Sequence, residues 1–316
     1  EEVRKDVSKG YLRPLSASSI RASEKPAVFY NRFIAVLVKK DKPNLDSDTV
    51  ERLRRDLSPR SIASLERAGV PLEWPCKHRG CDDAKRNLVN RSARTISQIS
   101  LCGVDKAIVL LDAAAEELGD LALNVADQGD AYRALRANAP FLRVLVVRDP
   151  EGIPHYFEFC RLSYGEELSV LGYCTFSVFI CRVTTGALAL PTDSYIDDYL
   201  NICKQKDRKI ANAFFLFFVA GLLGCYFNQE KGWSSTRGIF LGILFELQGA
   251  QCDLDCTVAR KEKILHIITQ ALQNDTLSDI QAERLAGILQ WVSATLIGRA
   301  GRTKITPILN RAHKGS

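Results

Sequence analysis

The spacing of apolar residues predicts strands and helices that follow one another irregularly along the chain. Residues 104–118 repeat apolar side chains at helical spacing, and residues 121–127 (LALNVAD) form a strand-length apolar run that ends in an acid. Residues 141–165 hold two β-rich runs around the turn DPEG, which predicts a hairpin. Because hairpins outnumber regular β-α-β units, we expect an α+β fold with an antiparallel sheet.

The same pattern predicts the remaining elements. We expect a strand at 32–40, helices at 47–57, 58–70, 167–188, 261–272 and 278–297, two short strands within 187–203 that meet near 195–198, and a hairpin at 237–247. Residues 1–30 are rich in Ser, Pro and charge and are typical of an extended arm, and residues 71–90 are turn-rich.

The most apolar segment, 210–227, predicts a helix that is buried on most sides. Its core, AFFLFFVAGLLGCYF, is shorter than the roughly 18–20 residues that a membrane span needs. We therefore expect no membrane partner.

Composition is that of a folded protein, with 46% apolar and 25% charged residues. The net charge of +6 is unevenly spread, because residues 1–60 and 257–316 each carry a net +5 and the middle is slightly acidic. This distribution suits a polyanion held by basic flanks around an acidic centre, and solvated helix faces explain it equally well.

Ten cysteines are scattered through the chain without a CxxC pair. The nearest pairs, Cys76/Cys81 and Cys252/Cys256, lack the spacing of a zinc module. Buried free thiols in a reducing, intracellular compartment are the better interpretation, with nucleus and cytoplasm both open.

Acids close two apolar strands, at Asp127 and at Asp197–Asp198 in YIDDYL. Either site alone is most often a turn. Together, three carboxylates would repel one another unless a cation compensates them, and carboxylate oxygens are the ligands that Mg²⁺ prefers.

An ordered series of motifs surrounds these acids. DQGDAYRAL is followed by LSYGEELSV, YIDDYL, the lysine of NQEKGW and the segment FLGILFEL. This series resembles the palm of reverse transcriptases, and KHRGCDDAKRNLVN upstream is similar to their finger segment. The resemblance covers residues 71–250 by motif and 256–310 only as helices in the place of a thumb.

The resemblance implies a right-hand polymerase with fingers, an antiparallel-sheet palm and a helical thumb. Residues 1–70 would be an N-terminal extension and the start of the fingers, 71–255 the fingers and palm, and 256–316 the thumb. The implied activity is RNA-directed DNA polymerisation, a nucleotidyl transfer that extends a primer 3′-end on a template. Primer–template nucleic acid and a dNTP would be its partners, within a retroelement-like protein that includes further domains or proteins of a larger assembly.

The resemblance also assigns site residues. Asp127, Asp197 and Asp198 would be catalytic, and two Mg²⁺ ions, or Mn²⁺ in their place, would be held by Asp127, Asp197 and the backbone carbonyl of Gln128. The residues implied in nucleotide binding are Lys77, Arg79, Lys85, Tyr132, Gly165 and Lys231, with an aromatic at Tyr132 favouring deoxynucleotides. The residues implied in nucleic-acid binding are Arg260, Lys261, Arg299, Arg302 and Lys304.

Three features depart from the family pattern. Gln128 replaces an apolar residue, LSYG replaces LPFG, and two acids, Glu166 and Glu167, follow that glycine. The two departures in the glycine loop motivate the alternative of a catalytically inactive, polymerase-derived scaffold that binds nucleic acid or protein. A third hypothesis, an unrelated α+β protein in which YIDDYL is only a turn, predicts that Asp127 lies far from Asp197.

Overall fold

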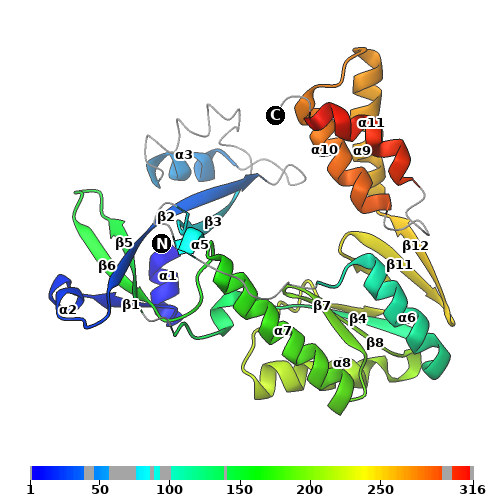
Figure 1. Ribbon diagram of the computed structural model, residues 1–316, viewed down its shortest axis with the longest axis horizontal. Helices are drawn as coiled ribbons and strands as arrows, with labels where there is room; N and C mark the ends of the chain where they lie inside the picture. The colour runs from blue at the N-terminus through cyan, green and yellow to red at the C-terminus, as the bar shows by residue number, and fades with distance from the viewer. Residues whose placement is uncertain are drawn as a thin grey trace. The chain divides into compact units, whose positions relative to one another are not determined.

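The computed structural model describes residues 2–38, 46–56, 76–85, 89–92, 101–138, 141–293 and 301–313. Their contacts divide the chain into two compact units, of which the first contains residues 1–95 and 135–170 and the second residues 96–134 and 171–316 (Figure 1). The chain thus crosses between the units three times. The helix expected at 58–70 lies outside the described residues.

The first unit is built on a five-stranded sheet in the order β1-β6-β5-β2-β3. Its strands are β1 (Leu12–Leu15), β2 (Ala27–Val38), β3 (Cys76–Asp82), β5 (Leu142–Arg148) and β6 (Pro154–Phe159), and its helices are α1 (Glu2–Ser8), α2 (Ala17–Arg21), α3 (Ser47–Asp56) and α5 (Val89–Ser92). The expected hairpin is confirmed as β5 and β6, and the strand expected at 32–40 is confirmed as part of β2. The sheet is mixed rather than purely antiparallel, because β2 and β5 pair in parallel.

Two expectations for this unit are wrong. The N-terminal segment is not an extended arm, since β1 pairs with β6 and Leu12, opposite Phe159, is buried in the core with Tyr30 and Leu145. Likewise, part of the turn-rich segment forms strand β3 against β2. In both cases the partner strand is distant in sequence, so tertiary pairing overrides the local preference of short, polar segments.

The second unit contains a four-stranded antiparallel sheet in the order β7-β8-β4-β9 and a three-stranded sheet in the order β10-β11-β12. The strands are β4 (Leu121–Asp127), β7 (Thr192–Tyr195), β8 (Asp198–Lys204), β9 (Trp233–Ser235), β10 (Arg237–Phe240), β11 (Ile243–Gln248) and β12 (Gln251–Cys256). The helices are α6 (Val104–Leu118), α7 (Glu167–Ala187, whose first four residues belong to the first unit), α8 (Arg208–Leu216), α9 (Val258–Gln273), α10 (Asp279–Val292) and α11 (Arg302–His313). Short 3₁₀ helices at Ala131–Ala134 and Gln205–Asp207 and a π-helical turn at Phe217–Leu222 complete the unit.

Strand β4 is buried along its whole length because both faces of the sheet are covered. Leu121, Leu123 and Val125 pack with α6 and the three-stranded sheet, whereas Ala122 and Ala126 pack with α7 and α8 (Figure 1). A strand that is covered on both faces has a continuous apolar run in its sequence. Burying a leucine side chain stabilises the fold by about 2 kcal/mol, so β4 is a rigid base for the acid at its end.

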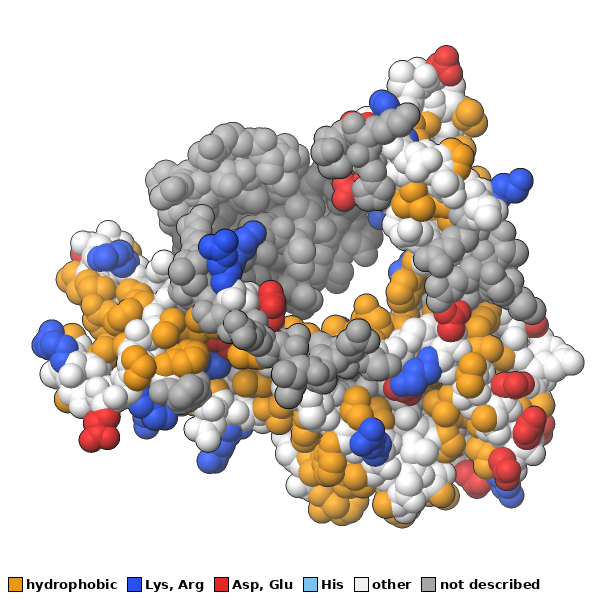
Figure 2. All heavy atoms as spheres, in the orientation of Figure 1, with side chains coloured by type: hydrophobic (Ala, Val, Ile, Leu, Met, Phe, Trp, Pro, Cys, Tyr) orange, Lys and Arg blue, Asp and Glu red, His pale blue; other side chains and the backbone are white. Residues whose placement is uncertain are grey.

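The apolar helix at 210–227 differs from its expectation in two ways. It ends at Leu222, and Gly224 follows with a φ of +69°, in the left-handed region that ends many helices. Only one stripe of it, including Phe215 and Val219, is buried, while five large apolar side chains of this segment are more than half exposed: Ile210, Phe214, Phe217, Leu222 and Tyr226. Figure 2 shows hydrophobic side chains gathered in the region that α7 and α8 occupy in Figure 1. Apolar composition alone thus overestimates burial.

Helix α7 is the one helix of the described residues that is long and apolar enough to cross a membrane by length and composition. Its residues Tyr173 and Ile180 are fully buried within the protein. Core helices often pass such a test, so the composition of α7 carries no membrane assignment.

A carboxylate-lined candidate active site

The pairing of β4 with β8 brings the predicted acids together. Asp127, the last residue of β4, is the register partner of Asp198, the first residue of β8. Asp197 precedes it in the two-residue loop between β7 and β8, and all three acids line one pocket of about 740 Å³. Residues 70 positions apart in the sequence therefore share a site, and the hypothesis that Asp127 lies far from Asp197 is wrong.

Backbone hydrogen bonds fix the hairpin turn against β4. The Gln128 N–H donates to the carbonyl oxygen of Asp197 at 2.9 Å, and the Asn228 N–H donates to that of Asp127 at 2.9 Å. Ile196, the first loop residue, has a φ of +58°, which both common two-residue hairpin turns require but a β-branched residue rarely adopts. Such an outlier persists only where the surrounding structure enforces it, so the turn is held in a fixed geometry.

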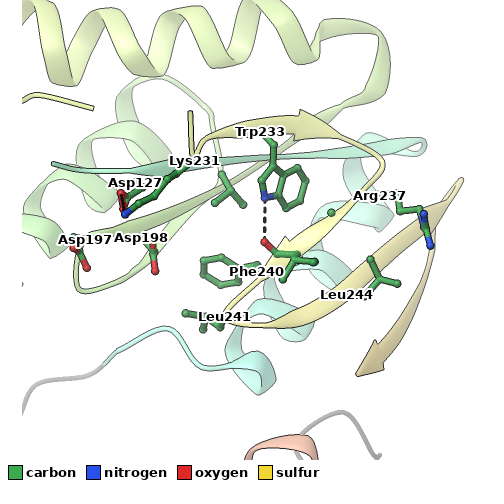
Figure 3. A pocket seen from close by; sticks show the side chains of 12 residues that line it. Asp127, Asp197, Asp198, Lys231, Trp233, Arg237, Phe240, Leu241 and Leu244 are labelled. Carbon is green, nitrogen blue, oxygen red and sulfur yellow. Dashed lines mark hydrogen bonds and ion pairs between the residues drawn. The ribbon is translucent and has the colours of Figure 1, made fainter. Parts of the chain in front are cut away.

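Lys231 compensates one of the three carboxylates. Its Nζ lies 2.7 Å from both Oδ1 and Oδ2 of Asp127. The Asp127 side chain is 10% exposed and that of Lys231 is 58% exposed, so a cation from the rim reaches in to a nearly buried acid. Figure 3 shows this contact beside the carboxyl groups of Asp197 and Asp198, which point from the turn to the same side. The ammonium occupies a position where a bound cation would meet Asp127.

Negative charge at the site remains in excess. The pKa of Asp198 is raised to about 6, first because burial disfavours the charged form and then because Asp197 and Asp127 are close, while Lys231 acts in the opposite direction. Nearby, burial followed by the charges of Cys174 and Asp197 raises the pKa of Tyr132. A site of this kind favours cations.

The donor set fits a hard divalent ion such as Mg²⁺. Its side-chain donors are carboxylate oxygens, and a lysine already stands in for a cation at Asp127. Within the described part of the chain, no group of three or more His, Cys, Asp or Glu side chains is close enough to hold a metal ion. The protein would therefore supply part of each coordination shell and leave the rest to phosphates and water, as magnesium sites on phosphate substrates do.

Two residues beside the acids have structural partners that the sequence did not reveal. The buried side chain of Gln128 accepts hydrogen bonds from the hydroxyls of Tyr173 at 2.7 Å and Tyr199 at 3.3 Å, which explains a polar residue in a usually apolar position. Tyr132 is half-buried and packs edge-on against Tyr173, with the ring centroids 5.4 Å apart. The tyrosine pair thus supports both the end of β4 and the aromatic ring that follows it.

The glycine loop belongs to the first unit. Gly165 has a φ of +104°, and a Cβ there would overlap the backbone carbonyl of Asp82. The Asn90 side chain holds the loop, because its amide donates to the Gly165 carbonyl at 2.9 Å and its oxygen accepts from the Glu167 N–H at 3.0 Å. Glycine is required at this position because the chain turns left-handed while touching another backbone.

The acid after this glycine does not face solvent. Glu166 is 4% exposed and pairs with Arg143 at 2.9 Å, with further hydrogen bonds from the hydroxyls of Tyr30 and Ser169. A buried carboxylate with an Arg partner and two hydroxyl donors is a structural anchor. Packing thereby explains the first of the two acids that follow the glycine.

The other predicted nucleotide-binding residues are spread over both units. Lys77 and Arg79 lie on β3, but their side chains are outside the described residues, and Lys85 is exposed just beyond that strand. These three and Gly165 belong to the first unit, whereas Tyr132 and Lys231 belong to the second.

Of the residues predicted to bind nucleic acid, Arg260 has a packing role. Its guanidinium lies over the ring of Trp291, 6.0 Å from the centroid, and against Gly242 in the β10–β11 turn. Lys261 forms an ion pair with Asp255 at 2.7 Å, and Lys304 is exposed on α11. The side chain of Arg302 and the whole of Arg299 lie outside the described residues.

Two tryptophans hold the β10–β11 hairpin in place opposite the acids, and the sequence analysis did not single them out. The Trp233 Nε1–H donates to the carbonyl of Ile239 at 3.0 Å, the bond drawn in Figure 3, and the Trp291 Nε1–H donates to that of Leu241 at 2.9 Å. A side chain at Gly238 would collide with the ring of Trp233. Trp233, the last residue of NQEKGW, offered a signal in the sequence, whereas Trp291 lies 50 positions after Leu241 and no motif marks it.

Comparison with known proteins identifies the fold and no family. No protein-family model and no curated protein matches the chain. A foamy viral protease-reverse transcriptase solved in complex with double-stranded DNA superposes with a TM-score of 0.54 over 96% of this chain, at 13% identity. A foamy viral protease-reverse transcriptase in complex with an RNA/DNA hybrid superposes over 68% of this chain with a TM-score of 0.47, at 16% identity. The chain spans only 41% and 26% of the length of those two proteins. At such identity the likeness shows a mixed α+β, reverse-transcriptase-like fold, and function is a separate question.

Proposed function

We propose that the chain is a template-directed nucleotidyl transferase of the reverse-transcriptase type, which extends a primer 3′-end with deoxynucleotides. The observation that carries the proposal is the register of β4 and β8, which brings Asp127, Asp197 and Asp198 into one pocket. The reverse-transcriptase-like fold of the chain supports it, and the structural neighbours were solved with double-stranded DNA or an RNA/DNA hybrid. In this proposal the four-stranded sheet is the palm, the five-stranded sheet belongs to the fingers and helices α9 to α11 form the thumb.

Asp127 and Asp197 would hold two Mg²⁺ ions, with the Gln128 carbonyl as a further ligand and Asp198 close beside them. When bound, the ions would supply charge stabilisation to the attacking and leaving oxygens of phosphoryl transfer. Lys231, which pairs with Asp127 in their absence, would be released towards the incoming phosphates. The ring of Tyr132, braced by Tyr173, would lie under the sugar and exclude a 2′-hydroxyl.

The structure weakens the case for an inactive scaffold. That alternative rested on the loop departures, LSYG and the two acids after Gly165, and one of these acids, Glu166, is occupied by buried hydrogen bonds, as is Gln128. Neither removes a carboxylate from the pocket. Packing therefore accounts for Gln128 and Glu166, and the scaffold alternative keeps LSYG and the exposed Glu167 as its grounds.

Primer extension on RNA and DNA templates, with Mg²⁺ or Mn²⁺, tests the proposal. Wild-type protein should add deoxynucleotides, and Asp197→Asn should abolish extension while its thermal unfolding stays unchanged. Glu167→Gln, which neutralises an exposed acid outside the pocket, is the matched control and should keep wild-type activity. Extension by Asp197→Asn at the wild-type rate would contradict the site assignment, and binding without extension under every condition would favour the scaffold.

A further inference from the structure

A second cavity, of about 780 Å³, lies at the opposite end of the β4–β8 pair from the acids. At one end of this pair Asp127 faces Asp198, and at the other Leu121 faces Lys204, six residues along each strand. At the rise of a β-strand this separation is about 20 Å. The residues that line the cavity are Leu118, Asp120, Lys204, Gln205, Lys206, Arg208 and Lys209.

The backbone around this cavity is ordered by neighbouring elements. Helix α6 ends at Leu118, and the Gln205 N–H donates to the carbonyl of Asp120 at 2.9 Å. Strand β8 ends at Lys204, the 3₁₀ helix Gln205–Asp207 follows, and α8 begins at Arg208. Four cations within six consecutive residues are thus presented from a fixed segment.

These four cations stand out because they are clustered and because no acid of the described residues pairs with them. Lys204, Lys206, Arg208 and Lys209 form no ion pair and no side-chain hydrogen bond with any residue that the structure describes. Some cations elsewhere in the described structure have acid partners, as Arg143 has in Glu166 and Lys106 in Asp193, whereas single exposed cations such as Lys304 have none. Asp120 in the cavity and Asp207 in the turn offset part of this charge, and Glu116 and Glu117 lie in the last turn of α6 beside it.

We propose that this cavity binds the phosphodiester backbone of a single nucleic-acid strand, at a site separate from the carboxylate pocket. Phosphate oxygens would neutralise the four cations, three of which are lysines, whose flexible point charges suit a backbone of variable path. The distance of about 20 Å to the acids exceeds the Debye length at physiological salt, about 8 Å, so the acids do not repel the strand.

Helix α8 favours a strand over a free phosphate compound. Helix α8, which carries Arg208 and Lys209, exposes 58% of Phe214, and the π-helical turn that continues it exposes 63% of Phe217. Neither ring lines the cavity itself. Basic grooves with exposed aromatic rings bind single strands without sequence preference, because bases stack on the rings. The site does not depend on the polymerase proposal, since none of its residues lies in the carboxylate pocket.

The test is the affinity of the full chain for a fluorescent 12-nucleotide single strand, measured by anisotropy with unlabelled primer–template present in saturating excess. The variant Lys206→Glu/Lys209→Glu reverses two exposed cations, so it should fold normally. We expect at least a tenfold loss of affinity and a shallower salt dependence, by roughly 0.7 in the log–log slope for each lost phosphate contact. The control Arg4→Glu/Lys5→Glu makes the same charge change on exposed positions of α1 and should alter affinity less than twofold.

Equal affinity of wild type and Lys206→Glu/Lys209→Glu, or an equal loss in the control, would overturn the proposal. Two further arms identify the ligand. Phe217→Ala should lower the affinity for the strand at least fivefold. Tripolyphosphate should displace the strand only at a much higher phosphate concentration than the strand itself contributes. Displacement by tripolyphosphate at equal phosphate concentration, or binding of phosphatidylserine vesicles in place of the strand, would overturn the assignment to a nucleic-acid strand. Repeating the series in Asp197→Asn separates the two sites, because strand binding should persist where extension is lost.

Discussion

Two pairs of adjacent acids, Glu166–Glu167 and Asp197–Asp198, lie in opposite kinds of surroundings. Glu166 is buried deeply, yet Arg143 and two hydroxyl groups satisfy it, and Glu167 is exposed to solvent. Asp197 and Asp198 are half-buried beside Asp127, with which Lys231 forms an ion pair. The pKa of Asp198 is accordingly raised to about 6.

This difference separates acids that stabilise the fold from acids whose arrangement suits the binding of a cation. A buried carboxylate with fixed donors contributes to one conformation and has no capacity left for another partner. A cluster of carboxylates with excess charge is destabilising by itself, and it becomes favourable only when a cation enters. The predictions below are directed at this contrast.

Removal of Asp127 should have the largest effect. Asp127→Asn should lower single-nucleotide incorporation at least a thousandfold, which corresponds to about 4 kcal/mol of transition-state stabilisation. Its thermal unfolding should stay close to that of wild type, because the Lys231 partner is largely exposed and such pairs contribute little. Incorporation within tenfold of wild type would show that this acid is not a ligand.

Glu166→Gln should show the opposite pattern. Leaving Arg143 buried without its partner should lower the free energy of unfolding by about 3 kcal/mol, measured by chemical denaturation. Activity per folded molecule should change less than tenfold, and Glu167→Gln next to it should leave stability within about 0.5 kcal/mol of wild type. If Glu166→Gln were neutral for stability and abolished extension, the assignment of this acid to the fold would be wrong.

Substitution of the glycine before this pair should have the next largest effect on stability. Gly165→Ala should destabilise by about 2–3 kcal/mol, because a positive φ and overlap with the Asp82 carbonyl add together. Gly152→Ala is the matched control, since Gly152 has a φ of +84° with open space around it, and it should cost about 1 kcal/mol. Equal losses of stability would mean that the close approach to Asp82 has no energetic weight.

Lys231→Gln should have the smallest effect on stability, below about 1 kcal/mol, because the lysine is mostly exposed. In the absence of substrates, the variant should bind Mn²⁺ a few-fold more tightly than wild type, because the Lys231 ammonium no longer competes for Asp127. Titration followed by the Mn²⁺ electron paramagnetic resonance signal measures this change. Weaker Mn²⁺ binding by the variant would contradict the role of Lys231 as a stand-in cation.

Much of the second unit could be predicted from sequence because its signals are local. The apolar run of β4, the helical periodicity of α6 and the YIDD hairpin are each confirmed within a few residues. Asp127 and Asp197 could be joined only through an ordered series of motifs, since no local rule specifies the pairing of β4 with β8.

What could not be predicted depends on contacts between distant segments. The pairing of β1 with β6 and the contact of Lys231 with Asp127 join residues more than 100 positions apart. The burial of Glu166 depends on Arg143 and Tyr30, which no spacing rule connects to it. The expectation that the apolar helix at 210–227 is buried on most sides failed for a different reason. Composition does not show which side of a helix packs against the core.

The most direct measurement counts Mn²⁺ ions bound by the protein with a dNTP and a primer–template whose 3′-end cannot react. Wild type and Glu166→Gln should each bind two ions with similar affinity, because the pocket acids are intact in both. Asp127→Asn and Asp197→Asn should lose at least one of the two ions or bind them more than tenfold more weakly. The same number and affinity of ions in all four proteins would contradict the account of these acids as metal ligands.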